Sequence, residues 1–380
     1  MISKNIYFKK FNFNHKNIAT KKNLNLIINS NNEVINSLKP DFKLNYKSKK
    51  IKKNLHLRII GVGGSILGAK AIYNFLKKKI KKKVYFIDNL NNQSRKNKKK
   101  FTNLIISKSG NTVETIVNSN ILIKKKDENL FITENKNSYL TILAQKMKSE
   151  IIHHNNYIGG RYSVLCETGM VPAHFMGLKI KKFKQLNNLV KNKIFLNSLI
   201  SNVNSTLFFL KKKKFNSVII NYDESSDSLF KWYQQLLAES LGKKNTGILP
   251  VISTMPMDNH SVMQLYLDGF KNNFFTFFYV NESRSPNILN HKILASHNFL
   301  KNKNIDQILY AQKKSTENVF KKKNIPFRTF EIKKRNEETI GELFCFFMLE
   351  TILLAKALKL NPFDQPAVEL IKKETKKILI

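Results

Sequence analysis

Short apolar runs that alternate with longer helical stretches are the feature that most restricts the fold of this chain. In the first half these runs cover residues 57–62, 84–87, 104–106 and 130–132. A second set covers 218–221, 247–252, 274–280 and 328–332, with helices predicted between them, notably at 225–241 and 337–358. Strands that alternate with helices at this spacing indicate doubly wound α/β domains with mainly parallel sheets. The sequence therefore predicts two such domains in succession.

The length of 380 residues suits two domains of ordinary size. We expect an N-terminal arm with one or two short helices over 1–50, a first domain over 51–190, a second over 191–360 and a C-terminal helical tail over 361–380. After a break at Pro362, the last helix is expected to run from about Gln365 to Lys377.

Membrane spans, secretion and disulfides are not expected. No apolar stretch reaches the roughly 18 to 20 residues that a membrane span needs. The first ten residues lack the apolar region of a secretory signal, so we expect a cytoplasmic protein. Cys166 and Cys345 are too few for a disulfide framework or a cysteine-based zinc site. We expect two reduced thiols.

The net charge of +41 raises nucleic acid as a partner. However, only six of the 67 cations are arginines, and arginine is the residue favoured for base edges and bidentate phosphate contacts. Lys, Asn, Ile and Phe all have codons rich in A and T, and no nucleic-acid motif accompanies the charge. We interpret it as compositional drift and expect no specific nucleic-acid partner, although the surface should attract anionic substrates at low salt.

A glycine-rich segment follows the first predicted strand and opens a helix. Residues 61–68 are Gly-Val-Gly-Gly-Ser-Ile-Leu-Gly, so that Gly64 and Ser65 lie in the loop. Glycines here let the backbone approach a ligand closely, and a helix N-terminus favours an anion. The spacing is not the Gly-x-Gly-x-x-Gly of a dinucleotide site. By itself the segment fits either a ligand loop or a tight turn.

The segment Ser-Lys-Ser-Gly-Asn-Thr-Val-Glu-Thr at 107–115 again follows a predicted strand. The hydroxyls of Ser107, Ser109 and Thr112, a permissive glycine and the following helix form a cup of donors that suits a phosphate monoester. A nucleoside triphosphate would need a Gly-Lys-Ser/Thr loop and a magnesium ligand, and neither is present. Alone, the segment also fits a serine-rich turn that caps a helix.

Arg161 is an arginine in a chain that otherwise uses lysine, and it follows two glycines. Its planar, permanently charged guanidinium suits the stabilisation of an oxyanion, although a lone arginine is more often a surface group.

Gln235 and Glu239 are four residues apart and so share a helix face. A carboxylate near a helix C-terminus is electrostatically disfavoured, which suits a general base. The alternative for Glu239 is a solvated glutamate beside Lys243.

Two further segments contain polar candidates. His260 follows Asp258-Asn259 and has acid/base potential only if it reaches the same cleft. Near the C-terminus, Asn-Pro-Phe-Asp-Gln-Pro-Ala-Val-Glu begins at residue 361. Gln365 and Lys372 are seven residues apart, two turns of the expected helix, and would share a face. Periodicity alone does not single out Lys372 among its neighbouring lysines.

Taken together and in this order, these motifs resemble the glucose-6-phosphate isomerase (phosphoglucose isomerase) family in its compact bacterial form. The resemblance covers about residues 57–378. It implies two sugar-isomerase (SIS) domains of α/β class with a C-terminal helix that completes the active site. It also implies a homodimer in which the partner subunit completes each site, and a hexose 6-phosphate substrate that is isomerised between glucose and fructose forms without a cofactor or metal.

The resemblance also implies roles for individual residues. Glu239 would shuttle the proton between C1 and C2, and Arg161 would stabilise the cis-enediolate. His260 and Lys372 would assist opening of the pyranose ring. The remaining residues would bind the substrate: Ser107, Lys108 through its backbone, Ser109 and Thr112 at the phosphate with Ser65 nearby, and Gly64, Gln235 and Gln365 lining the pocket.

Proton transfer between adjacent carbons needs one carboxylate and a preorganised cation at the oxyanion, and it needs neither a metal nor nicotinamide. Two alternatives compete with this prediction. One is an isomerase that also uses mannose 6-phosphate. The other is a sugar-phosphate sensor without catalysis, which we would expect to lack Glu239, Arg161 and Lys372 in these contexts and to contain a helix-turn-helix, and the sequence meets neither condition.

Overall fold

The computed structural model describes residues 1–11, 18–47, 56–90, 99–281 and 285–380. The strands are β1 Ile6–Lys9, β2 His56–Ile60, β3 Lys83–Ile87, β4 Thr102–Ile106, β5 Glu128–Glu134, β6 Glu150–His154, β7 Asn216–Asn221, β8 Leu249–Thr254, β9 Asn273–Val280 and β10 Phe327–Ile332. The α-helices are α1 Ile18–Ile28, α2 Glu33–Ser37, α3 Leu67–Leu76, α4 Val113–Leu122, α5 Tyr139–Lys146, α6 Glu167–Phe175, α7 Leu186–Val190, α8 Lys193–Lys211, α9 Asp227–Leu241, α10 Met263–Asp268, α11 Ile305–Lys322, α12 Glu337–Ala357 and α13 Val368–Leu379.

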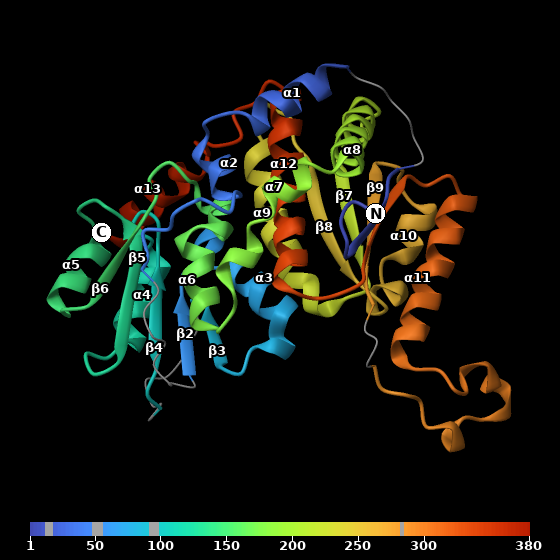
Figure 1. Ribbon diagram of the computed structural model, residues 1–380, viewed down its shortest axis with the longest axis horizontal. Coiled ribbons are helices and arrows are strands. Elements are labelled where there is room, and N and C mark those ends of the chain that lie inside the picture. The colour runs from blue at the N-terminus through green and yellow to red at the C-terminus, as the bar shows by residue number, and fades with distance from the viewer. Residues whose placement is uncertain (12–17, 48–55, 91–98, 282–284) are drawn as a thin grey trace.

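These strands form two five-stranded sheets with helices on their faces (Figure 1). The first sheet has the order β3-β2-β4-β5-β6, and all its strands are parallel. The order reverses between β2 and β4, which pair although β3 lies between them in sequence. In open α/β sheets, ligands bind outside the carboxyl ends of the strands at such a switch point.

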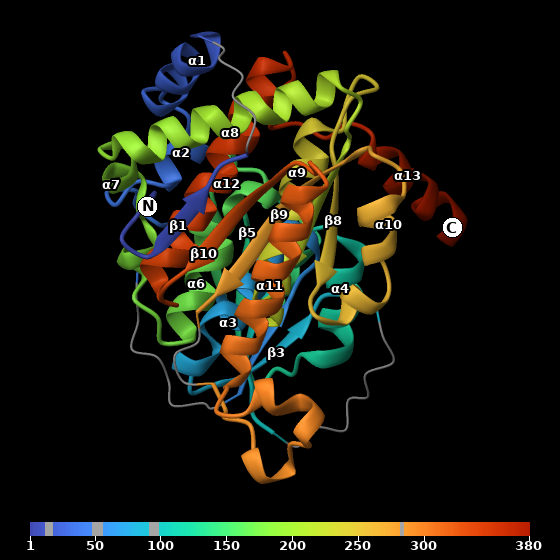
Figure 2. The ribbon, with the colours of Figure 1, turned by 90° about the vertical axis from the view of Figure 1, so that its right-hand side faces the viewer.

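The second sheet has the order β1-β10-β9-β7-β8 and its own switch point between β7 and β9. β7 to β10 are parallel, and β1 joins the edge antiparallel to β10 (Figure 2). The N-terminal arm contains two short helices, α1 and α2, as expected. It also contributes the strand β1, which was not expected, and Ile6 and Phe8 on β1 are buried. The expected domain boundary at residues 50–51 lies outside the described residues.

Alternate residues of the central strands enter different cores, because successive side chains of a strand point to opposite faces. On β4, Leu104 and Ile106 belong to a core that both halves share, whereas Ile105 packs on the outer face of the first sheet. On β9, Phe274 joins the shared core and Phe275 packs on the outer face of the second sheet. The two halves are therefore one packed body with an additional outer core on each side.

Three helices connect the halves. α3 of the first half packs along α9 of the second, and α12 packs against α9, α8 and α3 (Figure 1). The Asn336 side chain caps α12 by accepting a hydrogen bond from the N–H of Thr339 at 2.8 Å, and nearly all of the helix is buried. This packing fixes α9, which carries Gln235 and Glu239, against the first half.

The predicted α/β class with mainly parallel sheets is confirmed. In the part of the chain that the structure describes, no helix is long and apolar enough to cross a membrane.

Candidate active site

The loop after β2 lies at the switch point of the first sheet and contacts two other motifs. A Cβ on Gly61 would lie 2.8 Å from the carbonyl oxygen of Ile106, the last residue of β4. A Cβ on Gly64 would come within 2.3 Å of the backbone of Gly160. Both contacts require glycine. The loop that carries Gly64 and Ser65 therefore borders both the segment after β4 and the turn before Arg161.

The segment after β4 presents its hydroxyls at the carboxyl end of the sheet. The hydroxyls of Ser107 and Thr112 are hydrogen-bonded at 2.9 Å, and Ser109 Oγ accepts from the N–H of Asn111 at 3.2 Å. Gly110 has φ of 68°, and a Cβ there would lie 2.1 Å from Ser138 Oγ. Only glycine fits this turn.

The N-terminus of α4 is open toward this cup. Thr112 is its N-cap residue, but the side chain makes no capping hydrogen bond. The first amides of a helix have no intrahelical partner and attract anions. The carbonyl of Lys108 accepts from the N–H of Glu134 at 3.1 Å, and its ammonium lies 3.4 Å from that carboxylate. Lys108 therefore has its backbone in the turn and its side chain beside Glu134.

Arg161 is buried and uses its whole guanidinium. Nε donates to Ser240 Oγ at 2.9 Å, and Nη1 donates to Glu239 Oε2 at 3.2 Å and to Gln365 Oε1. Nη2 donates to the carbonyls of Pro362 at 2.6 Å and Asp364 at 2.9 Å. This full set of contacts holds the guanidinium in one orientation beside the carboxylate of Glu239.

Glu239 lies near the end of α9, and its side chain is 27% exposed. Gln235, one turn earlier, donates from Nε2 to Glu239 Oε1 at 2.9 Å. The other amide atom, Gln235 Oε1, is buried and has no hydrogen-bond partner among the described residues. A Cβ on Gly63 would lie 3.2 Å from Gln235 Nε2, so the loop after β2 borders this pair as well.

The segment 361–365 closes over Arg161. Lys243 holds it, since its ammonium donates to the carbonyl of Asn361 and lies 2.5 Å from Asp364 Oδ1. This ion pair lowers the pKa of Asp364. The last helix was expected to begin at about Gln365, which was wrong, because α13 begins at Val368. The residue before a proline is disfavoured in the helical conformation, and Pro366 follows Gln365. Gln365 therefore reaches Arg161 from the non-helical segment before α13.

The structure does not bring every predicted residue together. Lys372 lies on α13 with an exposed side chain. His260 is exposed in the short helix that follows β8, at the carboxyl end of that strand. Glu239 lies near the end of α9, just before the chain enters the amino end of β8. The six residues of β8 span about 20 Å, so His260 and Glu239 of one protomer lie at opposite ends of the sheet.

Several groups in the site escaped the sequence analysis. Ser240 bonds both Arg161 and the hydroxyl of Tyr162, the latter at 2.9 Å. Burial raises the pKa of Tyr162 to about 12, so its hydroxyl remains protonated and neutral. Lys243 and Asp364 belong to the quoted motifs, but nothing in their spacing shows that they pair across the chain. Within the described residues, no group of three or more His, Cys, Asp or Glu is placed to hold a metal ion.

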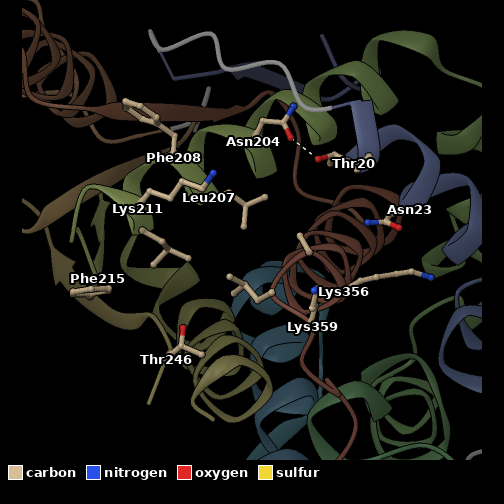
Figure 3. A pocket seen from close by; sticks show the side chains of 14 residues that line it. Thr20, Asn23, Asn204, Leu207, Phe208, Lys211, Phe215, Thr246, Lys356 and Lys359 are labelled. Atoms are coloured by element: carbon tan, nitrogen blue, oxygen red, sulfur yellow. Dashed lines mark hydrogen bonds between the residues drawn. The ribbon is translucent and has the colours of Figure 1, made fainter. Parts of the chain in front are cut away.

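A separate hollow of about 540 Å³ lies between α1 and the ends of α8 and α12 (Figure 3). Its polar side includes a hydrogen bond from Thr20 to Asn204 at 2.6 Å. Three of its 14 lining residues are lysines. With 61 lysines in 380 residues (67 cations less six arginines), about two are expected by chance. Lysines at helix C-termini also interact favourably with the helix dipole. The positive charge of this hollow is therefore not evidence for a bound ligand.

The chain is similar to known proteins in both sequence and fold. The family model described as phosphoglucose isomerase matches residues 27–380. A probable glucose-6-phosphate isomerase of Methanococcus maripaludis is 33% identical over 356 residues, 87% of this chain and 80% of that protein. A glucose-6-phosphate isomerase of Methanocaldococcus jannaschii is 32% identical over 336 residues, 83% of this chain and 82% of that protein.

Solved structures support the fold. A hypothetical protein from Thermus thermophilus superposes with a TM-score of 0.80 at 20% identity, covering 95% of this chain and 94% of that one. A glucose-6-phosphate isomerase from Chlamydia trachomatis superposes with a TM-score of 0.67 at 19% identity, covering 86% of this chain and 70% of that one.

Proposed function

We propose that this chain, which belongs to the phosphoglucose isomerase family, interconverts D-glucose 6-phosphate and D-fructose 6-phosphate in glycolysis and gluconeogenesis. The observation that carries the proposal is the pairing of Arg161 with Glu239 at 3.2 Å, beside the amides of Gln235 and Gln365. Three segments that lie far apart in sequence meet there: the turn at Arg161, the end of α9 and the segment that carries Gln365. A carboxylate next to a fixed cation is what proton transfer through an enediolate requires.

The first chemical step opens the pyranose ring. A proton must leave O1 and another must reach the ring oxygen, and we assign this exchange to His260 and Lys372. The carboxylate of Glu239 then takes the proton from C2, and the electron pair moves through the C1–C2 bond onto O1. The result is a cis-enediolate, whose negative charge Arg161 stabilises.

In the second half of the reaction, the enediolate is protonated at C1. A proton moves from O2 to O1, the carbonyl forms at C2, and Glu239 returns its proton to C1. Glu239 is a carboxylate again at the end of the reaction, and no atom is gained or lost. Because Gln235 holds Glu239 Oε1 and Arg161 holds Oε2, the carboxylate keeps a fixed position between C1 and C2.

The phosphate is assigned to the cup at the first switch point, formed by Ser107, Ser109, Thr112 and the backbone of Lys108, with Ser65 nearby. Gly64 belongs to the loop that connects this cup with Arg161, and it would line the pocket together with Gln235 and Gln365. The open N-terminus of α4 supports this assignment, because unpaired amides favour a dianion.

We further propose a cytoplasmic homodimer. Within one protomer, His260 lies at the end of the second sheet that is remote from Glu239, so a ring-opening role requires His260 of a second copy. The boundaries at residues 50, 190 and 360 remain our proposal for the domains, with 361–380 completing the site. The basic surface is assigned no specific nucleic-acid partner.

A coupled assay of fructose 6-phosphate conversion, run with a chelator present, tests the function. We expect steady turnover to glucose 6-phosphate. Absence of turnover by the folded protein would contradict the proposal. A parallel assay with mannose 6-phosphate determines whether the enzyme has dual specificity.

A further inference from the structure

A buried pair closes the base of the segment that carries Arg161. His154 is the last residue of β6, and Glu167 is the first residue of α6. Their side chains are 0% and 1% exposed, and His154 Nδ1 lies 2.9 Å from Glu167 Oε2. Everything between them, including the turn at 155–160 and Arg161 itself, forms a loop whose two ends this contact joins.

The second ring nitrogen of His154 holds the turn. Nε2 lies 3.1 Å from the carbonyl oxygen of Ile158, a fully buried residue three positions before Arg161. Carbonyl and carboxylate oxygens only accept hydrogen bonds, so the ring makes both bonds when each nitrogen carries a proton. The imidazole thus connects the start of α6 to the backbone of the turn.

The N-terminal arm completes the arrangement. Glu167 Oε1 accepts from the N–H of Asn45 at 3.0 Å, and the side chain of Asn155 donates to Glu33 Oε2 at 2.8 Å. Burial raises the pKa of Glu167, but the hydrogen bond and charge of His154 together with backbone N–H donors, that of Asn45 among them, outweigh this, and the net pKa lies below its ordinary value. Both oxygens of the buried carboxylate therefore have donors, one from the arm and one from His154.

The turn has little freedom on its other side. Gly160 packs against Gly64 of the loop after β2. The carbonyl of Arg161 accepts from Trp232 Nε1 at 3.2 Å. Because Ile158 is only three residues before Arg161, a displacement of the backbone at Ile158 would also move the guanidinium beside Glu239. A shift of about 1 Å in a catalytic group can cost on the order of 10² in rate.

We infer that His154 is a positioning residue: with Glu167 it fixes the backbone at Ile158 and so holds Arg161 where it faces the reacting carbons. The arm supports this clamp through Asn45. The inference rests on the proposed function only for its effect on turnover, because the structural effect is measurable without substrate.

The test uses the full chain with His154→Leu and Glu167→Leu combined. Removing both partners avoids leaving a buried charge unpaired, and such replacements are often neutral for stability. We expect kcat to fall at least about tenfold, while KM for fructose 6-phosphate changes less than about threefold because the phosphate cup lies on another loop. The single variant His154→Gln, which keeps one donor, should be intermediate.

A spectroscopic signal makes the test independent of activity. Trp232 is the only tryptophan of the chain, and its indole N–H bonds the carbonyl of Arg161. In 15N-labelled protein, its single indole resonance should shift in the double variant. The matched control, Thr20→Val with Asn204→Leu, removes a buried pair in the hollow of Figure 3 and should leave the indole resonance and kcat unchanged.

A folded double variant with the parent's kcat and the parent's indole resonance would overturn the inference. If the double variant does not fold, His154→Gln and Glu167→Gln are judged by the same two measurements. If the parent itself shows no isomerase activity, the proposed function fails, and the indole resonance still decides whether His154 positions Arg161.

Discussion

The two halves of the molecule have the same strand order around their switch points but opposite chemistry there. At the first, after β4, the structure places hydroxyls and the open N-terminus of α4. At the second, it places carboxylates after β7, the strand that corresponds in order to β2 of the first sheet. Asp227 is the first residue of α9, and it accepts hydrogen bonds from Asn221 at 2.6 Å and from Thr254 at 3.0 Å.

The second switch point is therefore occupied by the chain itself. A helix N-terminus favours an anion, and Asp227 supplies one from within the protein. Burial raises the pKa of Asp227. Nearby, Asp223 pairs with Arg335 at 2.5 Å. The comparison shows that the shared topology creates two potential anion sites, and that side chains in the loops leave one available to a substrate.

We expect the largest effect from substitutions in the phosphate cup after β4, the switch point that is available to a substrate. Ser109→Ala with Thr112→Val removes two hydroxyl donors from the phosphate cup. Losing two hydrogen bonds to a charged group costs on the order of 3 to 6 kcal/mol if both are desolvated, so affinity for 6-phosphogluconate should fall roughly 10² to 10⁴-fold by calorimetric titration. The matched control at the other switch point is Ser226→Ala with Thr254→Val, which removes the hydroxyl donors to Asp223 and Asp227 and should leave this affinity unchanged. Equal losses in both variants would abolish the distinction between the halves.

The second prediction concerns what the second half does contribute. Glu239→Gln should lower kcat by about 10² or more, because the amide cannot accept the proton, while 6-phosphogluconate still binds. Glu224→Gln is the same substitution at an exposed position just before α9, and it should retain the parent's kcat. Near-normal turnover of the Glu239 variant would remove this residue from the mechanism.

A smaller effect is expected where the C-terminal segment bridges the halves. Asp364→Asn weakens the contact with Lys243, and a partly exposed ion pair contributes only about 0 to 1 kcal/mol. We therefore expect at most an about fivefold loss in kcat/KM by the coupled assay. Glu374→Gln removes the exposed pair with Lys377 and should have no effect. A loss above about a hundredfold for Asp364→Asn would show that the pair does more than hold the segment.

The smallest effect concerns α12, the helix between the halves. Burial raises the pKa of Glu342 to about 7 from an ordinary value of 4.5. The stability that its protonated form contributes is present below pH 4.5 and is lost as pH rises to 7. Glu342→Gln should therefore raise Tm at pH 8 by a few degrees, at about 2–4 °C per kcal/mol, and not at pH 4.5. In the control Glu374→Gln, at an exposed position on α13, the difference in Tm from the parent should not grow with pH in this way. A pH-independent gain for Glu342→Gln would contradict the assignment.

The sequence predicted the central strands because they are apolar and bounded by glycines or polar turns. It missed β1 and β6, which are short and contain polar residues. The four residues of β1 become a strand through pairing with β10, more than 300 positions away. The strand propensity of the β1 residues does not show that a distant strand is available to pair with them.

The individual motifs of the site were visible, but their convergence was not. The Gly-Gly-Arg segment, Glu239 and Gln365 meet only because α9 packs on α3 and the chain returns after α12. Spacing placed Gln365 on a helix, whereas it lies before α13 and is followed by a proline, which disfavours the helical conformation at Gln365. Nothing in the sequence indicated that His154 and Glu167 pair, since two polar residues 13 positions apart come into contact only when β6 and α6 are in place.

A crystal structure of the enzyme with 6-phosphogluconate tests the central claim most directly. The account predicts the phosphate within hydrogen-bonding distance of Ser107, Ser109 and Thr112 at the end of β4, with the second switch point still filled by Asp227. A phosphate bound at the end of β7, or anywhere other than the cup after β4, would contradict it.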